Sequence, residues 1–180
     1  MARHSHEEAR RSIASLRPES IESAALLPAL RTCAERMVHQ SGVIITTDGD
    51  SGGPAIPLRI KDTLFRIGQE AIANAVRHAK ATTINIYVRY ERSSVCLRIS
   101  DNGAGFVPGT EQSGFGIIGM RRRADSISAD SDIRSAPQTG TEVQIIAPLP
   151  AKLTLSTFAT SLKQYITYAA KRTHPYPDRG

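Results

Sequence analysis

A carboxylate, a carboxamide and two glycines follow one another in the segment DNGAGF at residues 101–106, directly after a run that resembles a β-strand. Ionised Asp101 only accepts hydrogen bonds, so it suits the exocyclic amine of adenine and is mismatched to the carbonyl that guanine carries there. Gly103 and Gly105 allow positive φ and a close approach of the backbone to a base. The segment therefore suits recognition of a base beside a phosphate.

A second set of polar residues recurs at four-residue steps within EAIANAVRH. Glu70, Asn74 and His78 stand at i, i+4 and i+8, so a helix would stack them along one ridge, where they could face a common ligand. The carboxamide oxygen of Asn74 suits Mg²⁺, which prefers hard oxygen ligands. Glu70 could polarise a water or a nucleophile, and Arg77 or His78 could contact phosphates. Taken alone, the same side chains could simply form the solvated side of the helix.

A glycine cluster follows in GFGIIGM, with Gly114, Gly116 and Gly119 just before or within a helical stretch whose first amides would favour an anion. Thr141, after a further glycine, could add a hydroxyl near the base. Each motif alone is weak, since Asp-Asn-Gly is also a common turn and no βαβ unit supports a dinucleotide site. Together they favour phosphoryl transfer from ATP, which depends on positioning and charge neutralisation.

Several helices and strands are expected to position these residues. Around the motifs we expect a helix at 61–80, a β-hairpin with strands at 84–90 and 95–99, a helix at 117–127 and a last strand at 141–147. Before them we expect helices at 7–16 and from 21 or 23 to about 40, and a strand at 43–47. This order predicts an α/β protein, a two-layer α/β sandwich with a mixed sheet and helices on one face.

The composition, 40% hydrophobic and 22% charged over 180 residues, is that of a soluble globular protein. We see no apolar run of about 20 residues and no signal peptide, so we expect a cytoplasmic location and no membrane segment. Residues 151–180 carry five basic side chains against one acid and so supply +4 of the net charge of +6. The remainder is near neutral, which argues against nucleic-acid binding. Cys33 and Cys96 lack metal-ligand spacing and are interpreted as reduced packing residues.

The four blocks together resemble the ATP-binding domain shared by sensor histidine kinases, DNA gyrase, the HSP90 chaperone and MutL. The resemblance covers about residues 7–150 and implies the Bergerat α/β fold with ATP and Mg²⁺ as cofactors. Within this group, QEAIANAVRHAKA, DNGAGF and GFGIIGMRRRA look most like histidine kinases whose partners are LuxR-type response regulators. By resemblance, Asn74 would ligate magnesium, Glu70 would be the nearby catalytic acid, and Asp101 would bind the adenine amine.

The same resemblance extends to the glycines. Gly103 and Gly105 would shape the nucleotide pocket, and Gly114 and Gly116 would belong to a mobile lid over the phosphates. Such domains usually show a glycine pair before the strand that follows the lid helix. Here Ala129-Asp130 stands in its place, which puts that turn in question.

The stretch EARRSIASLRPESI resembles the end of the second dimerisation helix of the kinase subfamily. We therefore expect residues 1–20 to end a dimerisation region, 21–150 to form the ATP-binding domain and 151–180 to be a basic tail with no assignable role. In this subfamily the phosphorylated histidine lies on the preceding helix. The acceptor is thus expected on another chain, His6 is disfavoured for that role, and the chain alone should be a monomer or weak dimer that does not phosphorylate itself.

The implied function is transfer of the ATP γ-phosphate to a histidine outside this chain and then to the receiver domain of a response regulator. Three alternatives remain open from the sequence. The chain could be an ATP-binding module without kinase activity, truncated or degenerate. It could be an ATPase of the gyrase or MutL kind, which the lack of a following transducer domain disfavours, or a serine kinase of the anti-sigma type.

Overall fold

The computed structural model describes residues 24–54, 56–107 and 115–150. The chain divides into two units, Met1–Leu149 and Pro150–Gly180, and every helix and strand given below belongs to the first. The helix expected at 7–16, the end of a dimerisation helix and the basic tail all lie outside the described residues. Within the described ranges, no helix combines the length and the apolar character needed to cross a membrane.

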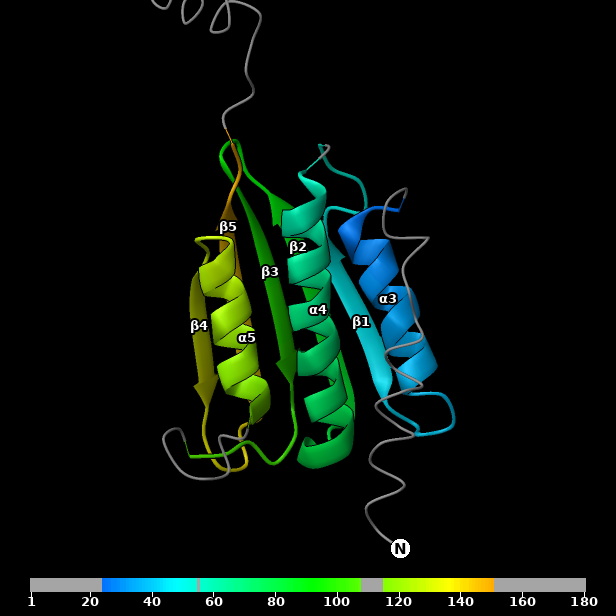
Figure 1. The fold of residues 1–180 in the computed structure, drawn as a ribbon. Coiled ribbons are helices and arrows are strands. Elements are labelled where there is room, and N and C mark those ends of the chain that lie inside the picture. Colours follow the sequence, from blue (N-terminus) through cyan, green and yellow to red (C-terminus); the bar gives the residue numbers. More distant parts are fainter. Residues whose placement is uncertain (1–23, 55, 108–114, 151–180) are drawn as a thin grey trace, which may run out of the picture. The chain divides into compact units, whose positions relative to one another are not determined.

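A mixed sheet of five strands, in the order β1-β2-β3-β5-β4, forms one layer of the described part of the chain (Figure 1). Its strands are β1 (Ile44–Gly49), β2 (Thr83–Tyr90), β3 (Ser94–Asp101), β4 (Asp130–Ser135) and β5 (Thr141–Pro148). β1 runs parallel to β2, as a connection through a helix allows, and all other neighbours are antiparallel. The expected hairpin is thus β2–β3.

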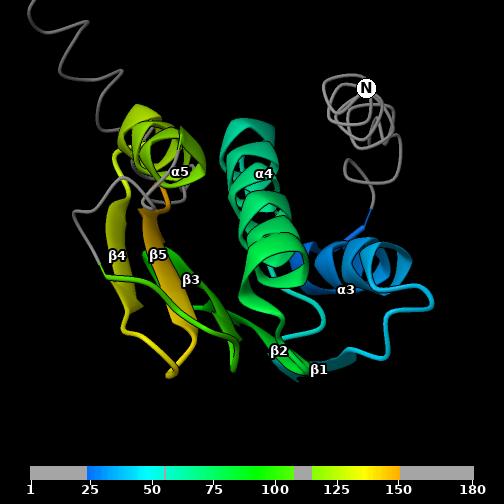
Figure 2. The same cartoon turned by 90° about the horizontal axis from the view of Figure 1, so that it is seen from below.

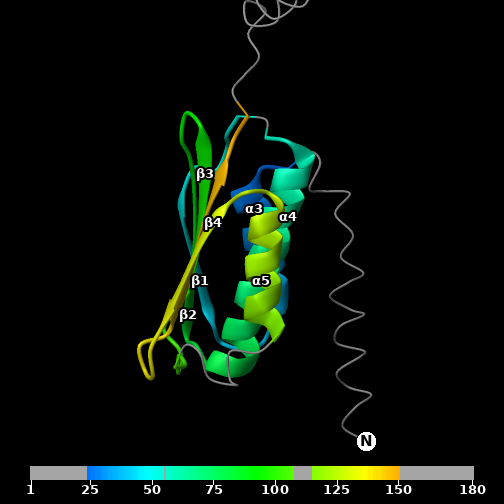
Figure 3. The same cartoon turned by 60° about the vertical axis from the view of Figure 1, so that its left-hand side comes forward.

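Helices form the second layer and cover one face of the sheet, as Figure 2 and Figure 3 show from two directions. They are α3 (Leu26–Met37), α4 (Leu58–Asn74) and α5 (Phe115–Ser126). Strand side chains alternate accordingly: Ile84, Ile86 and Val88 of β2 are fully buried toward the helices, whereas Asn85 and Arg89 are exposed. The two-layer α/β sandwich predicted from the sequence is confirmed.

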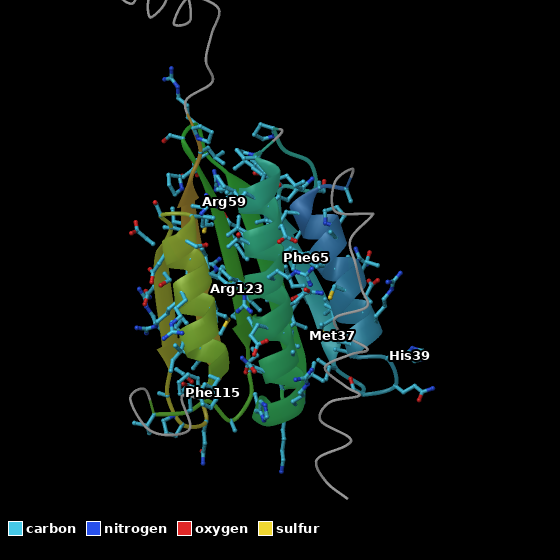
Figure 4. All side chains as sticks on the ribbon, in the orientation of Figure 1. Met37, His39, Arg59, Phe65, Phe115 and Arg123 are labelled. Atoms are coloured by element: carbon cyan, nitrogen blue, oxygen red, sulfur yellow. The ribbon has the colours of Figure 1, made fainter. Side chains whose placement is uncertain are left out.

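The helices pack closely because small residues permit it. A Cβ on Gly68 of α4 would lie 2.6 Å from Cδ2 of Leu30 on α3, so the glycine sets the approach of these two helices. At the other side of α4, Arg59 donates a hydrogen bond to the carbonyl of Ser126. Figure 4 shows Arg59 and Phe115 toward opposite ends of the helical layer. The end of α4 and the start of α5 therefore share one end of the helical layer.

The face of the sheet away from the helices is polar. The Arg98 guanidinium lies over the Tyr87 ring, 4.7 Å from its centroid, on strands where the two residues are paired in register. Cys96 lies half-buried on this face, and burial is the main cause of the raised pKa of its thiol. Cys33 lies buried in α3, and both cysteines are free thiols.

The helix expected at 61–80 starts earlier, at Leu58, and does not continue as an α-helix to its end. After Asn74 the chain forms a π-turn, η1 (Ala75–Ala79), and then stops at Lys80, which adopts left-handed φ of 49°. A π-turn is wider than an α-turn, so the residues after Asn74 leave the i, i+4 register. His78 therefore does not continue the ridge that carries Glu70 and Asn74.

The turn between α5 and β4 forms without glycine. The amide of Ala129 donates to the carbonyl of Ala124 at 3.0 Å, and the amide of Ser128 donates to the carbonyl of Asp125 at 2.9 Å. This pair of bonds is the Schellman arrangement that ends many helices, with Ser128 at φ 54° in the position that glycine usually takes. The substitution at Ala129-Asp130 thus leaves the turn intact, and β4 begins directly after it.

Candidate functional site

Three polar side chains form one row across the sheet at a single end of its helix-covered face. Asp101 ends β3, Thr141 begins β5 and Ser135 ends β4, and the strand register pairs Asp101 with Thr141 and Thr141 with Ser135. They share the parity of the buried residues Ile99 and Val143, so they face the helices. The fold thereby joins the DNGAGF segment to the distant Gly-Thr pair.

Asp101 is half-buried at the centre of this end of the sheet. Its Oδ1 accepts a hydrogen bond from the amide of Gly103 at 2.8 Å. Burial raises the pKa of the Asp101 carboxyl, and hydrogen bonds from the Gly103 and Thr141 amides only partly offset that rise. The carboxyl thus lies half-buried at the end of the helix-covered face of the sheet, held by backbone amides.

Ser135 connects the row to the loops around it, although it was not among the residues predicted from the sequence. Its Oγ accepts from the amide of Phe106 at 2.9 Å, donates to the carbonyl of Gly140 at 2.9 Å and lies 3.1 Å from Oγ1 of Thr141. A single serine in a polar strand carries no motif. Only the pairing of β4 with β5 reveals that it contacts the DNGAGF loop and the Gly-Thr turn together.

The two glycines of the DNGAGF loop have different steric reasons. Gly105 adopts φ of 59°, and a Cβ there would overlap the carbonyl oxygen of Ala136. Gly103 does not have positive φ, contrary to expectation. It is needed because a Cβ would overlap Ala79 at the end of η1, where the Ala104 amide donates to the Ala79 carbonyl at 2.7 Å. The loop is thus pinned against the end of the helix that carries the polar ridge.

The start of α5 lies directly on that ridge. A Cβ on Gly116 would lie 2.5 Å from Oε1 of Glu70 and 3.3 Å from Nδ2 of Asn74, so only a glycine fits without movement of these half-buried side chains. A Cβ on Gly119 would meet only the mobile end of Arg123. Phe115, at the first position of α5, is 92% exposed (Figure 4).

The remaining predicted residues are placed less tightly. Arg77 and His78 are exposed on the π-turn, and among the described residues no hydrogen bond or ion pair connects them to Asp101 or Thr141. Gly114 lies outside the described residues. The structure therefore brings Glu70, Asn74 and Gly116 together and leaves the two basic side chains at the edge.

The carboxamide of the DNGAGF segment, on Asn102, bonds to the segment before β2. Oδ1 of Asn102 accepts from the amides of Thr82 and Thr83 at 2.9 Å each, and its Nδ2 donates to Oγ1 of Thr82 at 2.8 Å. These bonds hold the segment before β2 against the loop that follows Asp101. These bonds give the carboxamide a role within the fold, and its part in base recognition stays a prediction.

Glu70 and Asn74 offer a carboxylate and a carboxamide oxygen, which are hard ligands suited to Mg²⁺. In the described ranges no group of three or more His, Cys, Asp and Glu side chains is arranged to hold a metal ion. The donor set therefore fits magnesium that arrives with phosphate oxygens and keeps several waters. It does not fit a metal cage made by the protein alone.

Comparisons with known proteins agree on one family. The sequence profile of the family described as histidine kinase-, DNA gyrase B-, and HSP90-like ATPase matches residues 60–151. The signal transduction histidine-protein kinase/phosphatase DegS of Brevibacillus brevis is 29% identical over 150 residues, covering 83% of this chain and 39% of that kinase. UhpB of Salmonella typhimurium, with the same descriptive name, is 31% identical over 140 residues, covering 77% of this chain and 28% of that protein. The chain thus spans less than half the length of these relatives.

Solved structures show the same fold. The histidine kinase domain of the Erythrobacter litoralis blue-light activated histidine kinase aligns with a TM-score of 0.56 at 18% identity, covering 69% of this chain and 61% of that one. Full-length ShkA in complex with AMPPNP aligns with a TM-score of 0.58 at 20% identity, covering 70% of this chain and 30% of that one. At these identities the likeness concerns the fold alone.

Proposed function

The chain belongs to the family of histidine kinase-, DNA gyrase B-, and HSP90-like ATPases, and from this premise we propose that it is the ATP-binding catalytic portion of a two-component sensor histidine kinase. Its ATP-binding domain would be residues 21–150, with residues 1–20 as the end of a dimerisation helix. The observation that carries the proposal is the convergence of two acceptors on the sheet, Asp101 and Thr141, with the Glu70 and Asn74 ridge at one end of the fold.

Each part of this arrangement has a role in holding Mg-ATP. Asp101 would accept a hydrogen bond from the adenine amine, with Thr141 beside it. The Gly103 and Gly105 backbone would line the pocket beside Asp101, in a loop that leaves no room for a Cβ at either glycine. Gly114, Gly116 and Gly119 would belong to the segment over the phosphates, and the start of α5 would offer its free amides there.

Asn74 would hold magnesium through its carboxamide oxygen, and bound magnesium would neutralise charge on the phosphates. Glu70, one helical turn earlier, would orient the water or the nucleophile near the same place. Arg77 and His78, exposed on the π-turn, would meet phosphate oxygens from the edge of the site. In the transfer, the bond from the γ-phosphorus to the bridging oxygen breaks, a bond to a histidine nitrogen forms, and ADP leaves.

The acceptor histidine would be supplied by the helix of a kinase dimer, and the phosphoryl group would pass to the receiver domain of a response regulator, in this proposal one of the LuxR type. The support is that DegS, UhpB and the sensor protein VraS of Staphylococcus saprophyticus are named as sensor or signal transduction proteins. Transfer within this chain alone is expected to fail.

Calorimetric titration with Mg-ATP tests the binding step. Asp101→Ala should weaken binding by about 10- to 100-fold, because a hydrogen bond to a charged group contributes about 1.5–3 kcal/mol. Asp130→Ala is the matched control, since Asp130 is exposed at the far end of β4. Folded protein that takes up no nucleotide at millimolar concentration, or an Asp101→Ala variant that binds as the parent does, contradicts the proposal.

The transfer step needs a separate measurement. The chain is incubated with ATP labelled at the γ-phosphate and with a fragment that carries the acceptor helix of a related kinase, then assayed for acid-labile phosphate. The expected result is label on the histidine of the added fragment and none on this chain. Binding without transfer to any acceptor would favour a nucleotide-binding module, and acid-stable label on serine would favour a serine kinase.

A further inference from the structure

The directions of the hydrogen bonds around Ser135 are fixed, because each of its two backbone partners can only donate or only accept. The carbonyl of Gly140 can only accept, so the bond of 2.9 Å between it and Ser135 uses the single hydroxyl proton of Ser135. The amide of Phe106 can only donate, so its bond of 2.9 Å uses one lone pair of the same oxygen. One lone pair of Ser135 then remains.

The remaining contact of Ser135 is with Oγ1 of Thr141 at 3.1 Å, and either oxygen could serve as its donor if the pair stood alone. The proton of Ser135 is already engaged with Gly140. Thr141 must therefore donate its own hydroxyl proton to Ser135. All three hydrogen-bonding positions of Ser135 are then in use, and Oγ1 of Thr141 keeps only lone pairs for any other partner.

Because Asp101 and Thr141 are paired in register, the base site presents two acceptors side by side. From this geometry we propose, on the basis of the function proposed above, that Ser135 is a specificity-determining positioning residue. By orienting the Thr141 hydroxyl it would make the site select a purine with an amine at position 6 over one with a carbonyl there.

The mismatch of Asp101 with a carbonyl at position 6 supplies only part of this selection. A 6-oxopurine carries a proton on N1, which an ionised carboxylate accepts as readily as it accepts the adenine amine. The second acceptor, Oγ1 of Thr141, distinguishes the two kinds of purine. Adenine offers two amine protons to the two acceptors, whereas a 6-oxopurine directs the lone pairs of its carbonyl at the lone pairs of Thr141. If Thr141 were free to rotate, its hydroxyl would donate to that carbonyl and the selection would weaken.

The test compares Mg-ATP with Mg-ITP, which differs at this edge of the base, by calorimetry on the whole chain. The parent should bind ATP more tightly than ITP, so the dissociation constant for ITP divided by that for ATP is above one. Ser135→Ala should lower this ratio by about fivefold or more, because it frees the Thr141 proton. Ser135→Thr keeps the hydroxyl and should restore the ratio to within about twofold. Ser131→Ala is the matched control, a half-buried serine on the same strand and face.

The ratio separates specificity from a loss of structure. If Ser135→Ala weakens both nucleotides equally, or if the parent does not distinguish them, the inference is overturned while ATP binding stands. If the folded parent binds neither nucleotide, the proposed function fails and the inference with it. Should Ser135→Ala not fold, Thr141→Val replaces it: a drop in the ratio supports the inference, and equal weakening of both nucleotides overturns it.

Discussion

Replacing Asn102 with alanine tests whether the carboxamide of the DNGAGF segment is architectural. The change removes three hydrogen bonds, two from the amides of Thr82 and Thr83 and one to the Thr82 hydroxyl. Asn102 is exposed, so water can partly replace each bond, and about 0.5–1 kcal/mol apiece is the appropriate range. The free energy of unfolding should fall by about 1.5–3 kcal/mol, which lowers the midpoint of thermal unfolding by roughly 5–12 °C in a domain of this size.

Urea denaturation followed by circular dichroism measures this loss. Asn102→Asp keeps an oxygen for both amides and a second one that the Thr82 hydroxyl can reach, so it should lose less than about 1 kcal/mol. Asn85→Ala, an exposed position on the polar face of β2, is the control. The reasoning is refuted if Asn102→Ala unfolds at the same urea concentration as the parent and loses only nucleotide affinity, since the carboxamide would then act on the ligand.

Three further outcomes follow from the backbone and the buried carboxyl. Ser128→Gly should raise the free energy of unfolding by about 0.5–1 kcal/mol, because glycine adopts left-handed φ at no steric cost, and a lower urea midpoint would contradict this. Gly140→Ala should cost about 3 kcal/mol or more, because φ is 80° and the Cβ would overlap the Asp101 carbonyl; an unchanged melting temperature would refute it. Burial raises the folded-state pKa of Asp101 above its ordinary 3.8, so the folded chain binds this proton more tightly than the unfolded chain does. The stability that Asp101 contributes should therefore fall as pH rises from 3.8 through the raised pKa. Over the same pH window, nucleotide affinity should rise because the carboxylate becomes ionised. An affinity that calorimetry finds constant across this window would contradict the proposed role of Asp101 as an acceptor.

The layers of the fold were readable from the sequence because burial repeats with a clear period. The alternation at Ile84, Ile86 and Val88 marks a strand with one buried face, and the structure places all three under the helices. The glycine-rich loops were readable for a different reason, since glycine tolerates backbone approaches that other residues do not. A Cβ on Gly116 or Gly105 would meet a neighbouring polar or backbone atom, so both glycines are required by the packing of the fold, and their places near a ligand stay a prediction.

What the sequence concealed depends on pairing between distant segments. β4 has the polar sequence DSDIRS, with only Ile133 as an apolar residue, so its pattern does not predict a strand at the edge of the sheet. Ser135 lies on this strand, and its contact with Thr141 becomes visible only when β4 is paired with β5. The π-turn at Ala75–Ala79 is likewise invisible in the helical pattern, because the apolar arc continues through it while the chain geometry changes.

The row of Asp101, Thr141 and Ser135 crosses strands that are not consecutive in the chain, and this has a consequence for how the protein is made. β5 must close a long loop, containing α5 and β4, before it can pair with β3, and such distant closures are slow steps of folding. An intermediate that has only β1 to β3 and α4 would lack two of the three residues of this row, Thr141 and Ser135. Nucleotide would then bind the completed fold alone, so its presence in the cell would protect newly made chains from unfolding and proteolysis once they are complete and not before.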